Sequence, residues 1–240
     1  KFYFKALRAI LNRANAEGVG SVATYPFGRG GFEVSKLEEA TAKRYLPAAE
    51  LSKLKSTTAS NPQCEYARKL FLFSYYCYGI SFIDMAMLTT AHIKQMEDGD
   101  YIVYKRQKIK RQKGVKPISI KITPAIRQLI GSLQAASPTV DDFLLPIVTR
   151  SGYTGERLYM HIRTRYSKYQ KYLRLLAEEL GIDFHLTSYV SRHTAAMTLQ
   201  RNHIPREVIS QMLGHADLET TNIYLDSFDN EVINEAAKVL

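Results

Sequence analysis

Three side chains near the end of the sequence have types and an order that suit phosphodiester chemistry. They are Arg192, His215 and Tyr224. Arginine can hold two oxygens of a phosphate through its planar fork, and histidine can accept a phenolic proton. A tyrosine, with a reference pKa of about 10, attacks phosphorus only when neighbours help to remove its proton. The set therefore predicts a tyrosine nucleophile acting on a phosphodiester.

The motifs around these residues read Arg192-His-Thr, Leu213-Gly-His215 and Thr221-Asn-Ile-Tyr224. In these motifs the chain resembles the tyrosine recombinases of the phage-integrase family, and within it the integrases of mobile elements. The resemblance implies that Arg192 is the second catalytic arginine, that His215 is the fifth catalytic residue and that Tyr224 is the nucleophile. Tyr189, three residues before Arg192, stands where most of the family has histidine. We expect Tyr189 to donate a hydrogen bond to the phosphate or to pack on the same helix face.

The family resemblance also implies a reaction. Tyr224 would form a 3′-phosphotyrosyl link with double-stranded DNA and release a 5′-hydroxyl, without ATP, a cofactor or a metal ion. In the family a lysine in a strand hairpin gives a proton to the departing oxygen. The hairpin pattern points first to Lys108, with Lys110 and Lys113 as alternatives.

One position departs from the family pattern. The turn that normally carries the first catalytic arginine reads Tyr78-Gly-Ile-Ser81 here, so neither residue that could take the arginine's place is charged. Arg68 lies too far upstream on a helix to replace it. Arg106 on the hairpin is the better replacement. If no cation fills the gap, a slow enzyme or a protein that no longer cleaves DNA is expected.

The charge pattern favours a nucleic-acid partner. The formal net charge is +10, and residues 101–127 contain nine basic residues and no acidic one. A hairpin with so much charge of one sign repels itself unless a polyanion lies against it. The predicted DNA contacts in this hairpin are Lys105, Arg106, Lys110, Arg111 and Lys113.

The element pattern predicts a mainly α fold with a small β-sheet or hairpin, in the α+β class. Helical spacing of apolar residues favours helices over 2–16, 65–78, 162–180 and 206–213, and alternation favours strands at 101–104 and 118–122. We expect residues 1–47 to be the last part of a helical core-binding domain and its linker, and residues 48–240 to be the catalytic domain. Lys43 and Arg44 in the linker are expected to touch the DNA backbone.

Several other features bound the interpretation. Cys64 and Cys77 are too few for a disulfide framework and have no nearby histidine ligands, so we expect buried thiols, a reducing cytoplasm and no metal site. No apolar run is long enough for a membrane span. The first residue lies inside an amphipathic pattern, which is typical of a piece of a longer protein.

Two further functions stay open at this level. The chain could be a DNA-binding architectural or directionality factor of the same fold that does not cleave. It could also be a relaxing enzyme like the type IB topoisomerases, although the apolar segment after Tyr224 favours a recombinase. The family implies a nucleoid-associated homo-oligomer, with a tetrameric synapse on DNA.

Overall fold

The computed structural model describes residues 2–28, 30–37, 45–214 and 221–222. The predictions for Lys43, Arg44, His215 and Tyr224 therefore lie outside the described residues. The chain forms two compact units, Lys1–Ala42 and Lys43–Leu240. The assignment of residues 1–47 to a core-binding domain stays a prediction.

The first unit contains the helix α1 (Phe2–Ala16) and two short 3-10 helices, η1 (Val22–Thr24) and η2 (Val34–Leu37). Its aromatic rings cluster around the buried Phe27, which packs edge-on against Phe32, and the half-exposed rings of Phe4 and Phe32 lie 4.8 Å apart. The Tyr25 hydroxyl donates a hydrogen bond to Asn12 and ties this loop to α1.

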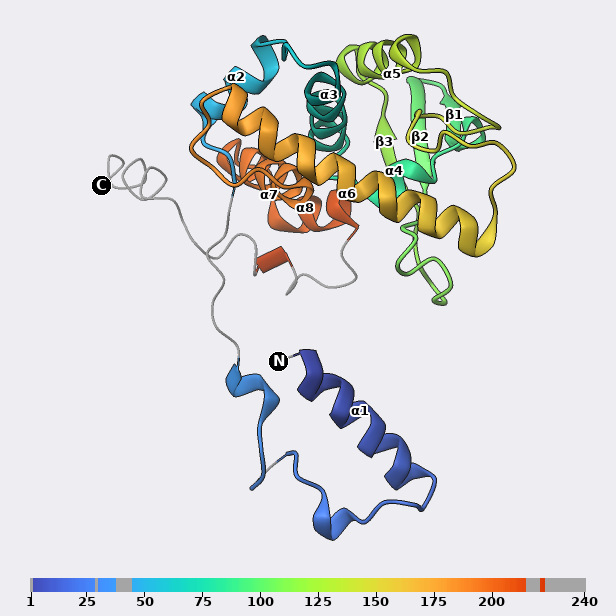
Figure 1. Ribbon diagram of the computed structural model, residues 1–240, viewed down its shortest axis with the longest axis vertical. Helices are drawn as coiled ribbons and strands as arrows, with labels where there is room; N and C mark the ends of the chain where they lie inside the picture. The colour runs from blue at the N-terminus through green and yellow to red at the C-terminus, as the bar shows by residue number, and fades with distance from the viewer. Residues whose placement is uncertain (1, 29, 38–44, 215–220, 223–240) are drawn as a thin grey trace. The chain divides into compact units, whose positions relative to one another are not determined.

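The second unit is mostly helical and carries a small sheet (Figure 1). Its elements confirm the predicted α+β class. In chain order they are α2 (Ala48–Ser56), α3 (Pro62–Tyr76), α4 (Phe82–Ala86), η3 (Thr90–His92), β1 (Ile93–Met96), β2 (Gly99–Tyr104), β3 (Ile118–Lys121), α5 (Pro124–Ala136), α6 (Gly155–Glu179), α7 (Ser188–Arg201) and α8 (Arg206–Leu213).

Helix α3 is the centre of the second unit. It packs against α5, α6 and α7, and Leu70, Phe71 and Phe73 are completely buried on it. The helix begins where the Asn61 side chain accepts hydrogen bonds from two backbone N–H groups of the first turn, which is a common N-cap arrangement. Because α3 is buried on several sides, the turn that follows it is held in a fixed position.

The sheet is antiparallel, with the strand order β1-β2-β3. Strands β2 and β3 confirm the predicted hairpin, in which Tyr104 lies opposite Ile118 and residues 105–117 form the connection. Strand β1 was not predicted. Its residues are mostly exposed, so they show little of the apolar alternation by which a strand is recognised.

Helix α6 differs from the prediction at its start. It begins at Gly155, seven residues before the predicted Ile162, and Figure 1 shows it running across the whole second unit. The first turns are largely exposed, and their apolar residues Leu158, Tyr159 and Met160 are consecutive, so these turns lack the apolar periodicity that marks the rest of the helix. The early start is important because it brings Tyr159 into the site described below.

Buried hydroxyl groups join α7 to its neighbours. Ser191 on α7 and Ser74 on α3 share a hydrogen bond of 2.7 Å, and the Ser74 hydroxyl also donates to the Ile80 carbonyl. Thr194 accepts a hydrogen bond from the Leu46 backbone N–H. Each of these three hydroxyls thus has a partner. The serines fix α7 against α3, and Thr194 fixes it to the segment before α2.

Candidate active site

Arg192 lies in the first turns of α7 and is 4% exposed. Its guanidinium donates one hydrogen bond to the Gly79 carbonyl at 3.0 Å and another to the Leu213 carbonyl. These contacts join the turn after α3 to the end of α8 through one cation. The side chain is therefore held rigidly before any substrate arrives.

Gly79 has the backbone conformation that this contact requires. Its φ angle is +71°, and a Cβ atom at this position would lie 2.4 Å from the Cα of Arg192. Only glycine allows α7 to approach the turn so closely. The glycine of the predicted arginine turn thus packs directly against the predicted catalytic arginine.

Arg106 lies directly beyond strand β2 and points to the same place. Its guanidinium donates a hydrogen bond of 3.1 Å to the carbonyl of Gly214, the residue after the Leu213 carbonyl that Arg192 contacts. Gly214 ends α8 in a left-handed conformation, and a Cβ atom there would clash with Ile118. Two guanidinium groups therefore meet on consecutive carbonyls, immediately before His215 in the sequence.

Ser81 is one of the two residues, with Tyr78, predicted to stand in place of the missing arginine, and the structure gives it a structural role. Its hydroxyl caps helix α4 and donates a hydrogen bond of 2.6 Å to Asp84. The other carboxylate oxygen of Asp84 accepts a bond of 2.7 Å from the backbone N–H of Gln107. Asp84 is 3% exposed, so it anchors the residue next to Arg106 from inside the protein. The Ser81-x-x-Asp84 spacing is the sequence signal of the helix cap, and it does not indicate the contact of Asp84 with Gln107.

Tyr104 lies within the same charged cluster but cannot act as a second nucleophile. Burial raises the pKa of its phenol, and the nearby Asp84 carboxylate raises it further, although Arg192 and Arg106 oppose this shift. The phenol is therefore protonated at neutral pH. Tyr78 is half-buried against the core and does not line the cavity next to Arg192.

A cavity of about 400 Å³ opens beside Arg192, between α4, α6 and α7. Arg192, Arg106, Tyr189 and Ser81 all line it, so the structure brings these four predicted residues together. Tyr189 is half exposed and packs edge-on against His193, with ring centres 5.0 Å apart. This exposure suits either of the two roles predicted for Tyr189.

The candidate lysines lie on the connection between β2 and β3. Lys108 is exposed and does not line the cavity, and Lys110 donates a hydrogen bond of 2.6 Å to the Gln107 side chain. Lys113 is exposed as well. The choice between these three lysines stays a prediction.

Arg68, by contrast, is fully engaged elsewhere. It is buried, bonds Glu65 with two nitrogens at 2.7 Å each, and donates a third hydrogen bond to the Leu54 carbonyl. The prediction that Arg68 does not replace the missing arginine agrees with this geometry.

Acidic residues neutralise part of the positive charge of the basic hairpin. Lys121 pairs with Asp98 and Arg127 pairs with Asp100, both acids lying just before the window of residues 101–127. The other seven basic residues of the window lie on the connection itself, where no ion pair is seen among the described residues.

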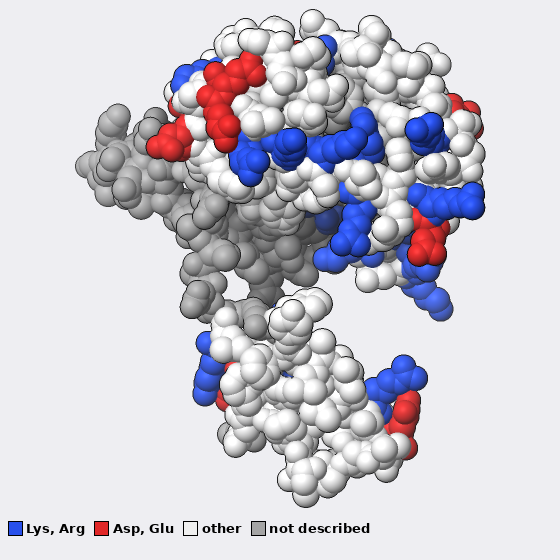
Figure 2. Space-filling model, viewed as in Figure 1, with Lys and Arg blue, Asp and Glu red and all other residues white. Residues whose placement is uncertain are grey.

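Figure 2 shows further Lys and Arg side chains on the face that α6 crosses, with the acidic ones toward its margins. Six basic residues and no acidic one occur between residues 157 and 177 of α6.

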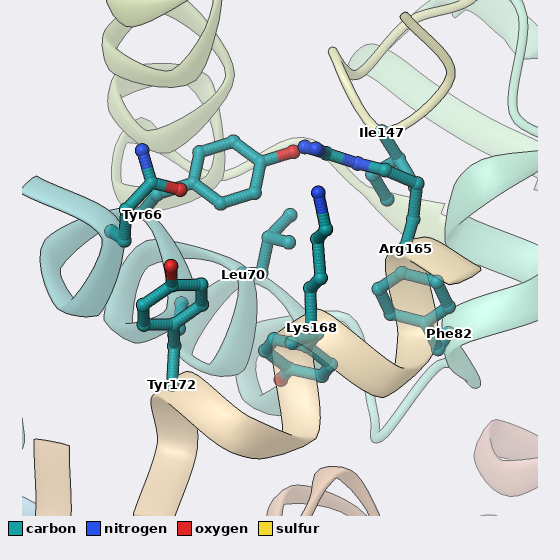
Figure 3. Close-up of a pocket in the computed structure, with 10 residues that line it drawn as sticks. Tyr66, Leu70, Phe82, Ile147, Arg165, Lys168 and Tyr172 are labelled. Carbon is teal, nitrogen blue, oxygen red and sulfur yellow. The ribbon is translucent and has the colours of Figure 1, made fainter. Parts of the chain in front are cut away.

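A second hollow lies between α3 and α6, on the other flank of α6. Figure 3 shows Arg165 reaching toward the Tyr66 hydroxyl, with Lys168 beside them. The enclosed volume is about 20 Å³, which is room for a water molecule and little more. This hollow is therefore too small for a substrate.

Metal ligands and membrane spans can be judged for the described residues only. No group of three or more histidine, cysteine or acidic residues in that part of the chain is arranged to hold a metal ion. No helix there has both the length and the apolar character needed to cross a membrane. Cys64 and Cys77 are both free thiols and are 2% and 1% exposed, as predicted.

Comparison with known proteins identifies the family and the fold. The profile of the Phage integrase family matches residues 44–231. The tyrosine recombinase XerC of Rhodospirillum centenum is 31% identical over 114 residues, which are 48% of this chain and 31% of XerC. The chain spans less than a third of the length of the curated XerC and XerD relatives that it matches.

Two solved structures share the fold. The XerH site-specific recombinase, bound to a palindromic difH substrate after cleavage, has a TM-score of 0.57 at 20% identity, covering 82% of this chain and 53% of XerH. The Tn1549 transposon integrase in complex with a circular intermediate DNA has a TM-score of 0.62 at 13% identity, covering 98% of this chain and 77% of the integrase. Since the family profile matches most of the sequence, the chain belongs to the phage integrase family.

Proposed function

We propose that this chain is the catalytic part of a site-specific DNA recombinase that cleaves and rejoins strands through a 3′-phosphotyrosyl intermediate. The observation that carries the proposal is the meeting of Arg192 and Arg106 on the Leu213 and Gly214 carbonyls, beside an open cavity. Two fixed cations at one point suit a phosphate group that gains negative charge in the transition state.

In the proposed reaction the phenolic oxygen of Tyr224 bonds to phosphorus, and the bond from phosphorus to the 5′-oxygen breaks. His215 takes or shares the phenolic proton, and Lys108 gives a proton to the departing oxygen. Arg192 and Arg106 neutralise the non-bridging oxygens. The hydroxyl of a second strand then attacks the phosphotyrosine link and restores the phenol.

Arg106 takes the part of the arginine that Ser81 replaces. A guanidinium has five N–H donors. Within the part of the chain that the structure describes, Arg106 uses one of them, in the hydrogen bond to the Gly214 carbonyl. The backbone next to Arg106 is held by the buried Asp84, so the cation is placed before DNA binds. Preorganisation of this kind is what makes a fixed cation effective in catalysis.

The proposed substrate is double-stranded DNA, gripped by the connection between β2 and β3 and by the linker residues Lys43 and Arg44. Two relatives of the same fold are seen in complexes with DNA, which supports the proposal. The match to the phage integrase family also supports a recombinase rather than a relaxing enzyme. Assembly of four copies into a synapse remains part of the proposal.

The test is a suicide-substrate assay. Parent protein is mixed with nicked duplexes carrying a core site, selected for binding from a random-sequence duplex pool, and covalent adducts are separated on a denaturing gel. We expect an adduct with the parent and none with Tyr224→Phe, which keeps the ring and loses only the nucleophilic oxygen. DNA affinity should be nearly equal for the two proteins.

Two results would contradict the proposal. An adduct with Tyr224→Phe would show that Tyr224 is not the nucleophile. Tight DNA binding without any adduct from the parent would favour the non-cleaving architectural factor.

A further inference from the structure

The cavity beside Arg192 is larger and more apolar than a phosphate requires. Its volume of about 400 Å³ lies within the range of roughly 300–1,000 Å³ that is usual for small-molecule sites. The buried side chains of Ile80, Phe82 and Ile162 line it. A phosphate alone would be served by the two arginines, so the apolar wall implies a larger guest.

Two tyrosines at the cavity expose their rings. Tyr159 on α6 is 60% exposed and Tyr189 on α7 is 52% exposed, although both line the cavity. Large aromatic rings that are open to solvent beside cations are typical of surfaces on which nucleic-acid bases stack. The rings and the arginines therefore suit two parts of one ligand, a base and its phosphate.

Polar groups form another part of the lining. The hydroxyls of Tyr166 and Ser188 lie 3.1 Å apart, and Gln170 joins them by donating to Tyr166 and accepting from the Ser188 backbone N–H. These three side chains are held in place by one another. Their hydroxyl groups can donate to and accept from the edge of a base that enters the cavity.

Ser81 leaves the space for such a guest. It lines the cavity at a position where the family pattern implies an arginine, and its short side chain is turned to Asp84. An arginine side chain at this position would project several bonds further toward the cavity. The departure from the family pattern therefore coincides with the room beside Arg192.

We propose that this cavity holds the deoxynucleoside next to the scissile phosphate, unstacked from the duplex, with its base against Tyr159. The inference rests on the proposed function, because it assumes that the phosphate between Arg192 and Arg106 belongs to DNA. A base that has left the stack is recognised by stacking on side chains and by hydrogen bonds to its edge. Both kinds of group are present here.

The test removes the Tyr159 ring from the protein and single bases from the DNA, separately and together. Affinity for the selected core duplex is measured for the Tyr224→Phe protein, in which binding is separated from chemistry, with and without Tyr159→Ala. The duplexes carry an abasic site at each position around the cleaved phosphate in turn. Met160→Ala is the matched control, because Met160 is the next residue on α6, is 49% exposed and does not line the cavity.

On intact DNA, Tyr159→Ala should weaken binding about five- to one-hundred-fold, the range found when a base loses its stacking partner. On the duplex that lacks the pocketed base, the same change should weaken binding less than about twofold, since the ring has no partner left. Met160→Ala should change little on any duplex.

The inference is overturned if Tyr159→Ala weakens binding equally on every abasic duplex, which would mean that the cavity serves the DNA backbone or another segment of the chain. It is also overturned if Tyr159→Ala has no effect. Adduct formation by the parent protein on the same sites is scored separately. A failed adduct assay therefore counts against the proposed function, whatever the binding arm shows.

Discussion

Gly79 determines where Arg192 lies. The glycine packs against the backbone and the first side-chain carbons of Arg192, and its carbonyl accepts a bond from the same guanidinium. A methyl group cannot enter without moving α7 away from α3. At the scale of single residues, the position of the candidate catalytic arginine thus depends on a residue that has no side chain.

Gly79→Ala should therefore lower the free energy of unfolding by roughly 2–4 kcal/mol, combining left-handed strain with overpacking. Gly181→Ala is the control, because Gly181 has a φ of +61° but nothing within 4 Å of its added Cβ. The control should lose only about 1 kcal/mol from strain. Denaturant unfolding measures both, and equal losses would contradict the close approach to Arg192.

At the scale of elements, Glu65 ties α3 to the segment before it. Its carboxylate bonds Arg68 on the next turn and the backbone N–H of Ala59. Burial raises the pKa of Glu65, but the bonds from Arg68 and Ala59 outweigh burial, so the net pKa is lowered. The carboxylate is therefore charged and bonded in the folded chain.

Glu65→Gln should lower the free energy of unfolding at pH 7 by about 2 kcal/mol or more, because it leaves the buried Arg68 without its anion. Because the pKa of Glu65 is lower in the folded chain than in the unfolded chain, its charge stabilises the fold at any pH above the unfolded pKa of about 4.3. This contribution is lost as the pH falls through the folded pKa of Glu65. The difference in the free energy of unfolding between the parent and Glu65→Gln should therefore become smaller in acid.

The control for this change is Asp98→Asn, which breaks the exposed pair with Lys121 and should lower the free energy of unfolding far less than Glu65→Gln. Thermal or denaturant unfolding across pH 3 to pH 7 checks the result. If the difference in the free energy of unfolding between the parent and Glu65→Gln stays constant with pH, the carboxylate of Glu65 does not stabilise the fold through its charge.

The elements differ in how far the sequence predicts them. Helix α8 could be predicted because Pro205 and Gly214 bound its apolar pattern, and the hairpin because its strands alternate. Strand β1 and the first turns of α6 could not, since both are largely exposed and show no periodic apolar face. Exposure, rather than length, decided which elements were missed.

The candidate site shows the same division. Arg192, Tyr189 and Arg106 were predicted from motif and charge, and the structure places all three at one cavity. The anchoring by Asp84 and the contact of Arg106 with Gly214 join residues far apart in the chain, so no local pattern contains them. The spacing of Ser81 and Asp84 is typical of a helix cap and could have predicted that role for Ser81. Comparison with the family pattern draws attention only to the absence of an arginine there.

At the scale of the whole molecule, the basic connection between β2 and β3 should set the salt dependence of DNA binding. Lys110→Gln with Lys113→Gln should lower the slope of log affinity against log salt by about 0.9 for each phosphate that the lysines no longer neutralise. Lys94→Gln with Lys121→Gln is the control on the same sheet, where both side chains are at least partly exposed. The slope is measured by fluorescence anisotropy over a series of salt concentrations.

The expected result is a shallower slope for the first pair and an unchanged slope for the second. If the first pair leaves the slope unchanged, the connection faces solvent in the complex. The DNA would then follow another basic surface, and the row of basic side chains on α6 would be the first to examine.

The most direct test of the account is the first-turnover rate of adduct formation by Arg106→Ala. If Arg106 holds the scissile phosphate together with Arg192, its loss should slow cleavage by about two to three orders of magnitude, much as Arg192→Ala would. Arg150→Ala, an exposed arginine of the same unit that does not line the cavity, should change the rate less than about threefold. Adding Ser81→Arg to Arg106→Ala should restore part of the rate, because a second guanidinium returns to the cavity. Cleavage by Arg106→Ala at the parental rate, with normal DNA affinity, would contradict the central claim that this arginine replaces the one that Ser81 displaced.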